Sequence, residues 1–362
     1  MLPWTVLALL VPYVVAAPAS SDCTGTISSL DDVTDAVECT TVNVNSFTVP
    51  AGETFTLSLL SGTTVNINGD IAFGNETWSG PLFEVKGDDI TFNGNGYRFD
   101  GGGPYYWDGE GTDGGVTKPH PMMKVEISGT MTDVYVVNSP AQCFSVSNTG
   151  PLTLSDITVD NSQGNAANSA SGSDPAGANT DGFDVAGSDL LITKSTVINQ
   201  DDCLAINSGS NITFSDNSCA DGHGISIGSI SSDKTVSDVV ISGNTVTNSQ
   251  QALRIKSDAD ATDSSVSSVT YSNNKATGIT KYGVLITQSY PDSVGTPGTG
   301  TTFSGISFTG GATTVAVEST AEMVAVDCGS GSCTGTWDWS DLTTSGGEDG
   351  AITNADISGF TQ

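Results

Sequence analysis

Short runs of alternating apolar and polar residues recur along the chain, with no helical pattern between them. Apolar residues two positions apart are typical of strands that bury one face. The clearest pairs are Phe144/Val146, Phe183/Val185, Leu204/Ile206, Ile225/Ile227, Leu253/Ile255 and Val284/Ile286. Because successive pairs begin 21 to 39 residues apart, they predict one structural unit that repeats along the chain.

A second pattern comes before the later pairs: two apolar residues five positions apart, then asparagine two positions further on. It occurs at Met131/Val136/Asn138, Leu154/Val159/Asn161, Ile192/Val197/Asn199 and Ile241/Val246/Asn248. Repeated short strands without helices predict an all-β fold, a parallel β-solenoid whose coils stack on one another, with asparagines at the corners. A β-sandwich is the competing interpretation, but Asn-Gly hairpin signals do not recur at regular spacing here.

The same repeat aligns a set of polar residues. A small residue stands directly before each alternating strand, as a tight corner requires: Cys143, Gly182, Cys203, Gly224, Ala252 and Gly283. One position earlier stand Asp181, Asp202 and His223, at intervals of 21 residues. Equivalent positions of neighbouring coils lie roughly 4.8 Å apart, so we expect these three residues to form a column on the outer surface.

This column, with Asp201 beside it, predicts acid–base chemistry. Like charges raise the pKa of at least one of several neighbouring carboxyl groups. A protonated carboxyl group next to an ionised one gives the acid and the base that glycosidic cleavage needs. The alternative is that these aspartates are ordinary solvated turn residues, but their common register favours a site. His223, one of only two histidines, lies in the same register.

Two cations follow one coil later, in Arg254-Ile-Lys256. Alternate positions of a strand face the same side, so Arg254 and Lys256 should point together. They could act as counterions of the carboxylates. A more specific role is to hold an anionic substrate, because a guanidinium group binds a carboxylate through two hydrogen bonds. Acid–base carboxylates beside such a pair suggest hydrolysis of a uronic acid polymer.

Net charge and the amino-terminal segment limit the possible partners and the location of the protein. With 10 Lys+Arg against 41 Asp+Glu, the formal net charge is −31, which argues against nucleic acid or an anionic membrane as a partner. An uncharged apolar run followed by small residues predicts a signal peptide over residues 1–19, with an amino-terminal anchor as the alternative. Residues 20–362 are then expected to form one secreted, extracellular domain.

The cysteines agree with an oxidising compartment. Six of the seven fall into neighbouring pairs without the CxxC spacing of zinc or redox sites, so we expect the disulfides Cys23–Cys39, Cys203–Cys219 and Cys328–Cys333. Cys143 is left over. Two N-x-S/T sequons predict glycosylation at Asn75 and Asn211.

Four segments resemble, in order and spacing, the signatures of glycoside hydrolase family 28 polygalacturonases, particularly the fungal endo enzymes. They are Asn179-Thr-Asp-Gly-Phe-Asp-Val, Asn199-Gln-Asp-Asp-Cys-Leu-Ala-Ile-Asn, Gly222-His-Gly-Ile-Ser-Ile-Gly and Arg254-Ile-Lys. Tyr290 resembles that family's substrate-binding tyrosine. The resemblance covers most of the mature chain, including residues 105–111 and the three cysteine pairs.

The resemblance implies a single-stranded right-handed parallel β-helix with an open substrate cleft, which cleaves the α-1,4 bonds of polygalacturonic acid with inversion and needs no metal or other cofactor. It implies that Asp202 is the general acid and that Asp181 and Asp201 activate water. His223 is expected to support the protonation of Asp202. The residues expected to hold substrate are Asn179, Arg254, Lys256 and Tyr290. The expected partners of a monomeric enzyme are pectin and plant inhibitor proteins.

Three alternatives stay open at this stage. An exo-acting enzyme would need added loops that close the cleft, whereas this chain is compact; residues 164–178 are expected to line one cleft wall. A pectate lyase would need calcium and an arginine base. A catalytically silent pectin-binding β-helix has no need of the acid pair. A carboxylate spacing near one coil step would also predict retention, in conflict with the inversion that the family implies.

Overall fold

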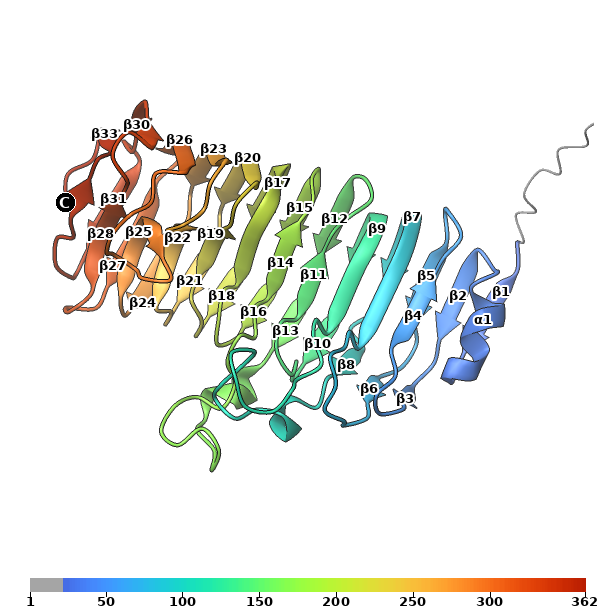
Figure 1. Cartoon of the computed structure of the whole chain (residues 1–362). Helices are drawn as coiled ribbons and strands as arrows, with labels where there is room; N and C mark the ends of the chain where they lie inside the picture. The colour runs from blue at the N-terminus through green and yellow to red at the C-terminus, as the bar shows by residue number, and fades with distance from the viewer. Residues whose placement is uncertain (1–21) are drawn as a thin grey trace, which may run out of the picture.

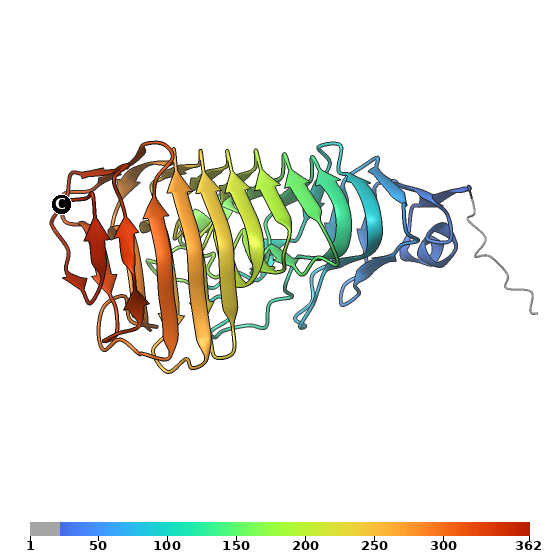
Figure 2. The same cartoon turned by 90° about the horizontal axis from the view of Figure 1, so that it is seen from above.

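The chain forms a parallel β-helix, seen from two directions in the computed structural model (Figures 1 and 2). The structure describes residues 22–362, and the signal peptide predicted for residues 1–19 lies outside them. Every strand pairing in this part of the chain is parallel, for example Phe144↔Phe183 and Leu204↔Ile225. The predicted fold class is therefore confirmed. No helix among residues 22–362 is long and apolar enough to cross a membrane.

Within residues 22–362 the strands make up three sheets. The largest has 20 strands: β1 (Thr24–Ile27), β2 (Thr41–Val44), β4 (Phe55–Ser58), β5 (Thr64–Ile67), β7 (Phe83–Asn93), β9 (Met123–Thr132), β11 (Phe144–Val146), β12 (Leu152–Ser155), β14 (Phe183–Ala186), β15 (Leu190–Thr193), β17 (Leu204–Ser215), β19 (Ile225–Ile230), β20 (Thr235–Ser242), β22 (Gln251–Asp258), β23 (Ser264–Ser272), β25 (Tyr282–Tyr290), β26 (Thr301–Phe308), β28 (Glu322–Asp327), β29 (Cys333–Thr334) and β32 (Ile352–Thr353). The second has 11 strands: β3 (Phe47–Val49), β6 (Ile71–Phe73), β8 (Arg98–Asp100), β10 (Tyr135–Val137), β13 (Thr158–Asp160), β16 (Thr196–Ile198), β18 (Ser218–Ala220), β21 (Thr245–Thr247), β24 (Lys275–Ile279), β27 (Thr313–Val317) and β31 (Leu342–Ser345). The third pairs β30 (Thr336–Asp338) with β33 (Asp356–Ser358). The helical elements are α1 (Val33–Ala36) and three short 3-10 turns, η1 (Leu30–Asp32), η2 (Gly103–Tyr105) and η3 (Ser162–Asn165).

The alternating strands align as the sequence predicted. Phe183 pairs with Leu204, Leu204 with Ile225 and Ile225 with Leu253, so one apolar column passes through successive coils. All these side chains are buried, and the next apolar column, which includes Val185 and Ile255, is buried beside them. Stacking therefore removes apolar area from water that no single coil could bury alone, which is why the repeats stabilise one another.

Asparagine and aspartate turn most of the corners, but the asparagines that bond to one another in a ladder are not those predicted there. The turns from the larger to the smaller sheet use single left-handed residues with φ between 54° and 58°: Asp133, Asp156, Lys194, Asp216 and Asn273. The ladder forms directly after these turns, where Asn217 Nδ2 donates to Asn244 Oδ1 at 3.1 Å and Asn244 Nδ2 donates to Asn274 Oδ1 at 3.0 Å. The predicted corner residue Asn199 instead bonds two carbonyl groups, of Thr180 and Asp202.

The three predicted disulfides are present, at Cys23–Cys39, Cys203–Cys219 and Cys328–Cys333. Cys143 is unpaired and buried, where it accepts a hydrogen bond from Asn161 Nδ2 at 3.3 Å. Burial raises the pKa of the Cys143 thiol to about 12, so it stays protonated and chemically inert at ordinary pH.

Two irregular segments project from one side of the β-helix, below β8, β10 and β13 in Figure 1. They are residues 101–120, which contain η2, and residues 161–180, which contain η3. The two pack on each other: the N–H of Gly109 donates to the carbonyl of Ala176 at 2.9 Å. Residues 161–180 end directly before Asp181, and residues 101–120 contact the same place through the N–H of Thr112, which donates to Asn179 Oδ1.

Candidate active site

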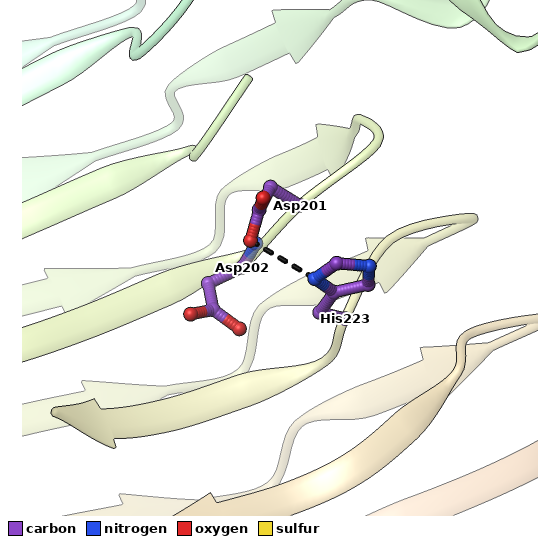
Figure 3. A group of neighbouring side chains, drawn as sticks. All are labelled: Asp201, Asp202 and His223. Atoms are coloured by element: carbon purple, nitrogen blue, oxygen red, sulfur yellow. Dashed lines mark hydrogen bonds and ion pairs between the residues drawn. The ribbon is translucent and has the colours of Figure 1, made fainter. Parts of the chain in front are cut away.

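Asp201 and Asp202 lie in the corner between β16 and β17, and His223 lies one coil away, between β18 and β19 (Figure 3). The His223 ring donates from Nδ1 to Asp201 Oδ1 at 3.0 Å, and its main-chain N–H donates to the Asp201 carbonyl at 2.7 Å. His223 keeps the expected step of one coil from Asp202, because Leu204 pairs with Ile225, but its side chain bonds Asp201 rather than Asp202.

The backbone explains why His223 bonds Asp201. The N–H of Gly182 donates to the carbonyl of Asp202, but one coil later the N–H of Cys203 donates to Gly224 rather than to His223. Gly224 has a left-handed φ of 78°, which shifts the hydrogen bonding by one residue and brings His223 beside Asp201.

Asp202 is buried and surrounded by hydrogen-bond donors. Its Oδ1 accepts hydrogen bonds from Ser226 Oγ at 2.8 Å and from Arg254 Nη2, and its Oδ2 accepts one from Lys256 Nζ at 3.0 Å. Asp202 is 1% exposed and Asp181 8% exposed, so the predicted column does not lie on the open outer surface. Arg254 and Lys256 help to bury Asp202, because both bond directly to its carboxylate.

Arg254 and Lys256 face the same side, as predicted, with Ile255 in the core. Both act as counterions of Asp202, the alternative that the sequence left open. Lys256 Nζ also lies 4.8 Å from the centroid of the Tyr290 ring, which brings the predicted substrate-binding tyrosine to the same place. A cation over a tyrosine face is attracted by the ring electrons.

Asn179 links the site to its flanking segment. Its Nδ2 donates to Asp201 Oδ2 at 3.3 Å, while its Oδ1 accepts the N–H of Thr112 at 3.0 Å. All eight residues predicted for the site are thus brought together, although their individual roles stay predictions.

Two further residues belong to this cluster, Asp184 and Ser226, to which the sequence analysis gave no role. Asp184, Ala205, Ser226 and Arg254 are in register on four successive strands, as the outward neighbours of the buried apolar column. Ser226 donates to Asp202 and accepts from Arg254 Nε at 3.0 Å. The signal for both was present, because each polar residue stands between two apolar residues of an alternating strand.

The carboxyl groups of the cluster have divergent pKa values. Burial, with the nearby charges of Asp201, Asp184 and Asp202, raises the pKa of Asp181 well above its ordinary value. Burial and the charges of Asp202 and Asp201 raise the pKa of Asp184 to about 7. Burial alone would raise the pKa of Asp201, but the His223 hydrogen bond and the cations outweigh it and lower that pKa to about 2. Such divergence within one site is typical of acid–base catalysis.

Asp201, Asp202 and His223 also offer ligand atoms within 4.8 Å of one another. These atoms are already committed: His223 Nδ1 to Asp201, and both oxygens of Asp202 to the two cations and Ser226. Arg254 and Lys256 supply the positive charge that a metal would bring. The donor set therefore does not fit a resident metal ion.

The raised pKa of Asp184 predicts a loss of stability with rising pH. In the folded protein Asp184 keeps its proton up to about pH 7, whereas the ordinary pKa of an aspartate is 3.8. The contribution of this proton to folding stability is therefore complete below about pH 4 and is lost as the pH rises through 7. In Asp184→Asn the melting temperature should fall by a few degrees less between about pH 4 and pH 8 than in the wild type. Scanning calorimetry across that range measures the difference, with Asp238→Asn, at an exposed residue of β20, as the control. Equal losses in all three proteins would contradict the assignment.

Comparison with known proteins gives a consistent result. The model of "Glycosyl hydrolases family 28" matches residues 39–359. Probable endopolygalacturonase A of Neosartorya fischeri is 45% identical over 360 residues, covering 94% of each chain. Endopolygalacturonase I of Aspergillus aculeatus is 40% identical over 364 residues, covering 95% of this chain and 92% of that one.

The solved structures agree with the sequence relatives. Endopolygalacturonase I from Stereum purpureum, complexed with two galacturonate, superposes with a TM-score of 0.87 at 50% identity, covering 92% of this chain and 98% of that one. The polygalacturonase from Erwinia carotovora shares the fold, with a TM-score of 0.63 at 18% identity, covering 94% of this chain and 99% of that one.

Proposed function

Because the chain belongs to glycosyl hydrolases family 28, we propose that it is an endopolygalacturonase, which hydrolyses α-1,4 bonds within polygalacturonic acid, the backbone of pectin. The observation that carries the proposal is the buried Asp202, bonded to Arg254 and Lys256 and adjacent to the ionised Asp201. This arrangement combines acid–base groups with cations that suit a uronate substrate.

Asp202 is the general acid in this proposal and protonates the oxygen of the leaving sugar. Asp201 is the acceptor for the proton of the attacking water, because its lowered pKa keeps it ionised in acid as well as at neutral pH. Asp181 holds a proton more readily and helps to orient the water. His223, bonded to Asp201, fixes that carboxylate rather than acting on Asp202 directly.

Substrate binding uses the two cations that bond to Asp202. A galacturonate carboxylate that reaches Arg254 and Lys256 shares them with Asp202, and Tyr290 packs against the sugar beside Lys256. The substrate carboxylate thus contacts the same two side chains as the acid. This places the bond to be cleaved next to Asp202 and ties recognition of the uronate to catalysis.

We assign inversion from family membership. Oxygen atoms of Asp201 and Asp202 lie within 4.8 Å, a separation that the usual rule, about 5 Å for retention and 6.5–9.5 Å for inversion, would assign to retention. That rule applies to an acid and a second carboxylate, nucleophile or base, that flank the scissile bond on opposite sides of the sugar. Asp201 and Asp202 share one corner of one coil, so their separation does not measure the space for water.

Internal cleavage is tested by following viscosity and reducing ends together on polygalacturonate. An endo enzyme lowers viscosity steeply while few reducing ends have formed, and this is the expected result. A proportional, slow fall in viscosity with monomer as the first product would support the exo alternative instead. No reducing ends, with polymer binding retained, would indicate a silent pectin-binding β-helix. Unsaturated products whose formation needs calcium would indicate a lyase.

The setting of the enzyme follows from the same proposal. Three disulfides are typical of an oxidising compartment, and we place the mature enzyme outside the cell as a monomer. Asn75 and Asn211 are exposed, so both sequons are open to glycosylation. Plant inhibitor proteins stay among the proposed partners, alongside pectin.

A further inference from the structure

The amide of Asn179 uses its two ends for two different purposes. The N–H of Thr112 donates to Oδ1 at 3.0 Å, and Nδ2 donates to Asp201 Oδ2 at 3.3 Å. With its oxygen bound to an N–H group, the amide has only one favourable orientation, and that orientation directs its NH₂ group to the carboxylate. Thr112 lies 67 residues before Asn179, so this contact joins the corner of the β-helix to a separate segment.

Thr112 sits in a loop that a buried ion pair closes. Asp108 and Lys118 pair at 2.7 Å, and the Lys118 side chain is only 1% exposed. Asp108 also accepts the N–H groups of Glu110, at 3.1 Å, and Val116, at 3.0 Å. Lys118 Nζ donates in turn to the carbonyl of Val116 at 3.1 Å. The two ends of residues 108–118 are therefore held together, although residues 112–117 between them are exposed.

The loop also fits closely on Asn179. Gly111 has a left-handed φ of 56°, and a Cβ atom added there would lie 2.0 Å from Asn179 Oδ1. Asn168 Nδ2 donates to the carbonyl of Trp107 at 2.9 Å, which fastens the start of the loop to the neighbouring segment 161–180. Only glycine leaves room for the Thr112 N–H group to approach the amide.

We propose that residues 108–118 form a clamp that positions the water-activating carboxylate of Asp201 through Asn179. Thr112, Asp108 and Lys118 are positioning residues in this account, because they act through Asn179 and not on the substrate. The proposal rests on the proposed function, since it takes the role of Asp201 from it.

Asp201 has two other side-chain and main-chain donors, His223 Nδ1 at 3.0 Å and the N–H of Asp202 at 2.8 Å. The charged and titratable groups around it are His223, Asp181, Asp184, Asp202, Arg254 and Lys256. Loss of the clamp leaves all of these in place and removes one neutral donor. The carboxylate should then bind its proton more tightly and move more freely, so both the acid side of the pH profile and kcat should change.

The test compares Thr112→Pro, which lacks the N–H group, with Thr112→Ala, which keeps it. Thr112 is exposed, so neither change disturbs the core. Thr112→Pro should lower kcat about tenfold, the size of one lost hydrogen bond, with KM changed less than about twofold. The acid limb of kcat/KM should move to higher pH, measured as the ratio of variant to wild type so that titration of the substrate cancels. Thr112→Ala should match the wild type.

A second pair guards against a general effect of proline on the loop. Lys118→Met should show a smaller loss of kcat and a smaller shift of the acid limb. Lys118→Arg, which keeps the ion pair, should have wild-type kcat and pH profile. Melting temperatures show whether each variant folds. Wild-type kcat and pH profile in Thr112→Pro would overturn the clamp, as would equal losses in Thr112→Ala. A rise in KM without a shift of the acid limb would also overturn it, because the segment would then bind substrate. If instead Asp201→Asn kept full activity, the proposed function itself would fail.

Discussion

Replacing Asp202 by asparagine should lower kcat by about 10²–10⁴-fold, the usual contribution of general acid catalysis. Asparagine keeps the shape, but with one oxygen instead of two it can accept a hydrogen bond from Arg254 or from Lys256 and not from both. It also has no acidic proton to give to the leaving oxygen. Because the neutral amide competes less for the two cations, oligogalacturonate should bind at least as tightly as to the wild type.

Steady-state kinetics on polygalacturonate and calorimetric titration with an oligogalacturonate measure the two effects separately. Asp238→Asn, an exposed aspartate on β20 with a left-handed φ of 55°, is a matched control that should keep wild-type activity. If Asp202→Asn retained more than a tenth of the wild-type kcat, Asp202 would not be the acid. Loss of oligogalacturonate binding would show that Asp202 contributes to the binding surface instead.

The second large effect is expected for Arg254→Gln. Arg254 bonds both Asp202 and Ser226 and is 7% exposed, so its loss leaves a buried carboxylate with one cation instead of two. Breaking a buried ion pair costs about 3–5 kcal/mol of folding stability. In catalysis, loss of charge-assisted hydrogen bonds to the substrate should reduce kcat/KM by about 10- to 100-fold, mostly through KM.

A double-mutant cycle separates these contributions. In Asp202→Asn/Arg254→Gln no charge is left unpaired between the two positions, so the double variant should be more stable than the sum of the single losses predicts. Thermal unfolding measures this coupling. Additive losses of stability would contradict Asp202 as the main partner of Arg254. An unchanged KM in Arg254→Gln would contradict the contact of Arg254 with substrate.

The repeat of the sequence predicted the fold, because burial in a β-helix follows period-2 alternation closely. The pairs Phe183/Val185 and Leu253/Ile255 lie in the predicted columns, with the polar residue between them turned outward. The same alternation placed Arg254 and Lys256 on one side. It could also have identified Asp184 and Ser226, since both occupy the equivalent outward position.

Other features depend on backbone turns and distant contacts that alternation does not encode. At the left-handed Gly224 the main-chain hydrogen bond from Cys203 changes partner, and His223 bonds Asp201 rather than Asp202. The burial of Asp181 and Asp202 is likewise not given by their spacing along the sequence. The contact of Thr112 with Asn179 joins two irregular segments, whose conformations no periodic pattern specifies.

The central claim is that this chain hydrolyses polygalacturonate by a single displacement, with Asp202 as the acid. Proton NMR of the first products, recorded before mutarotation, tests it most directly. An α-linked substrate cleaved with inversion should give the β-anomer at the new reducing end, with no unsaturated sugar, and Asp202→Asn should abolish the signal. Initial formation of the α-anomer would contradict the account, because it would mean retention through a covalent intermediate.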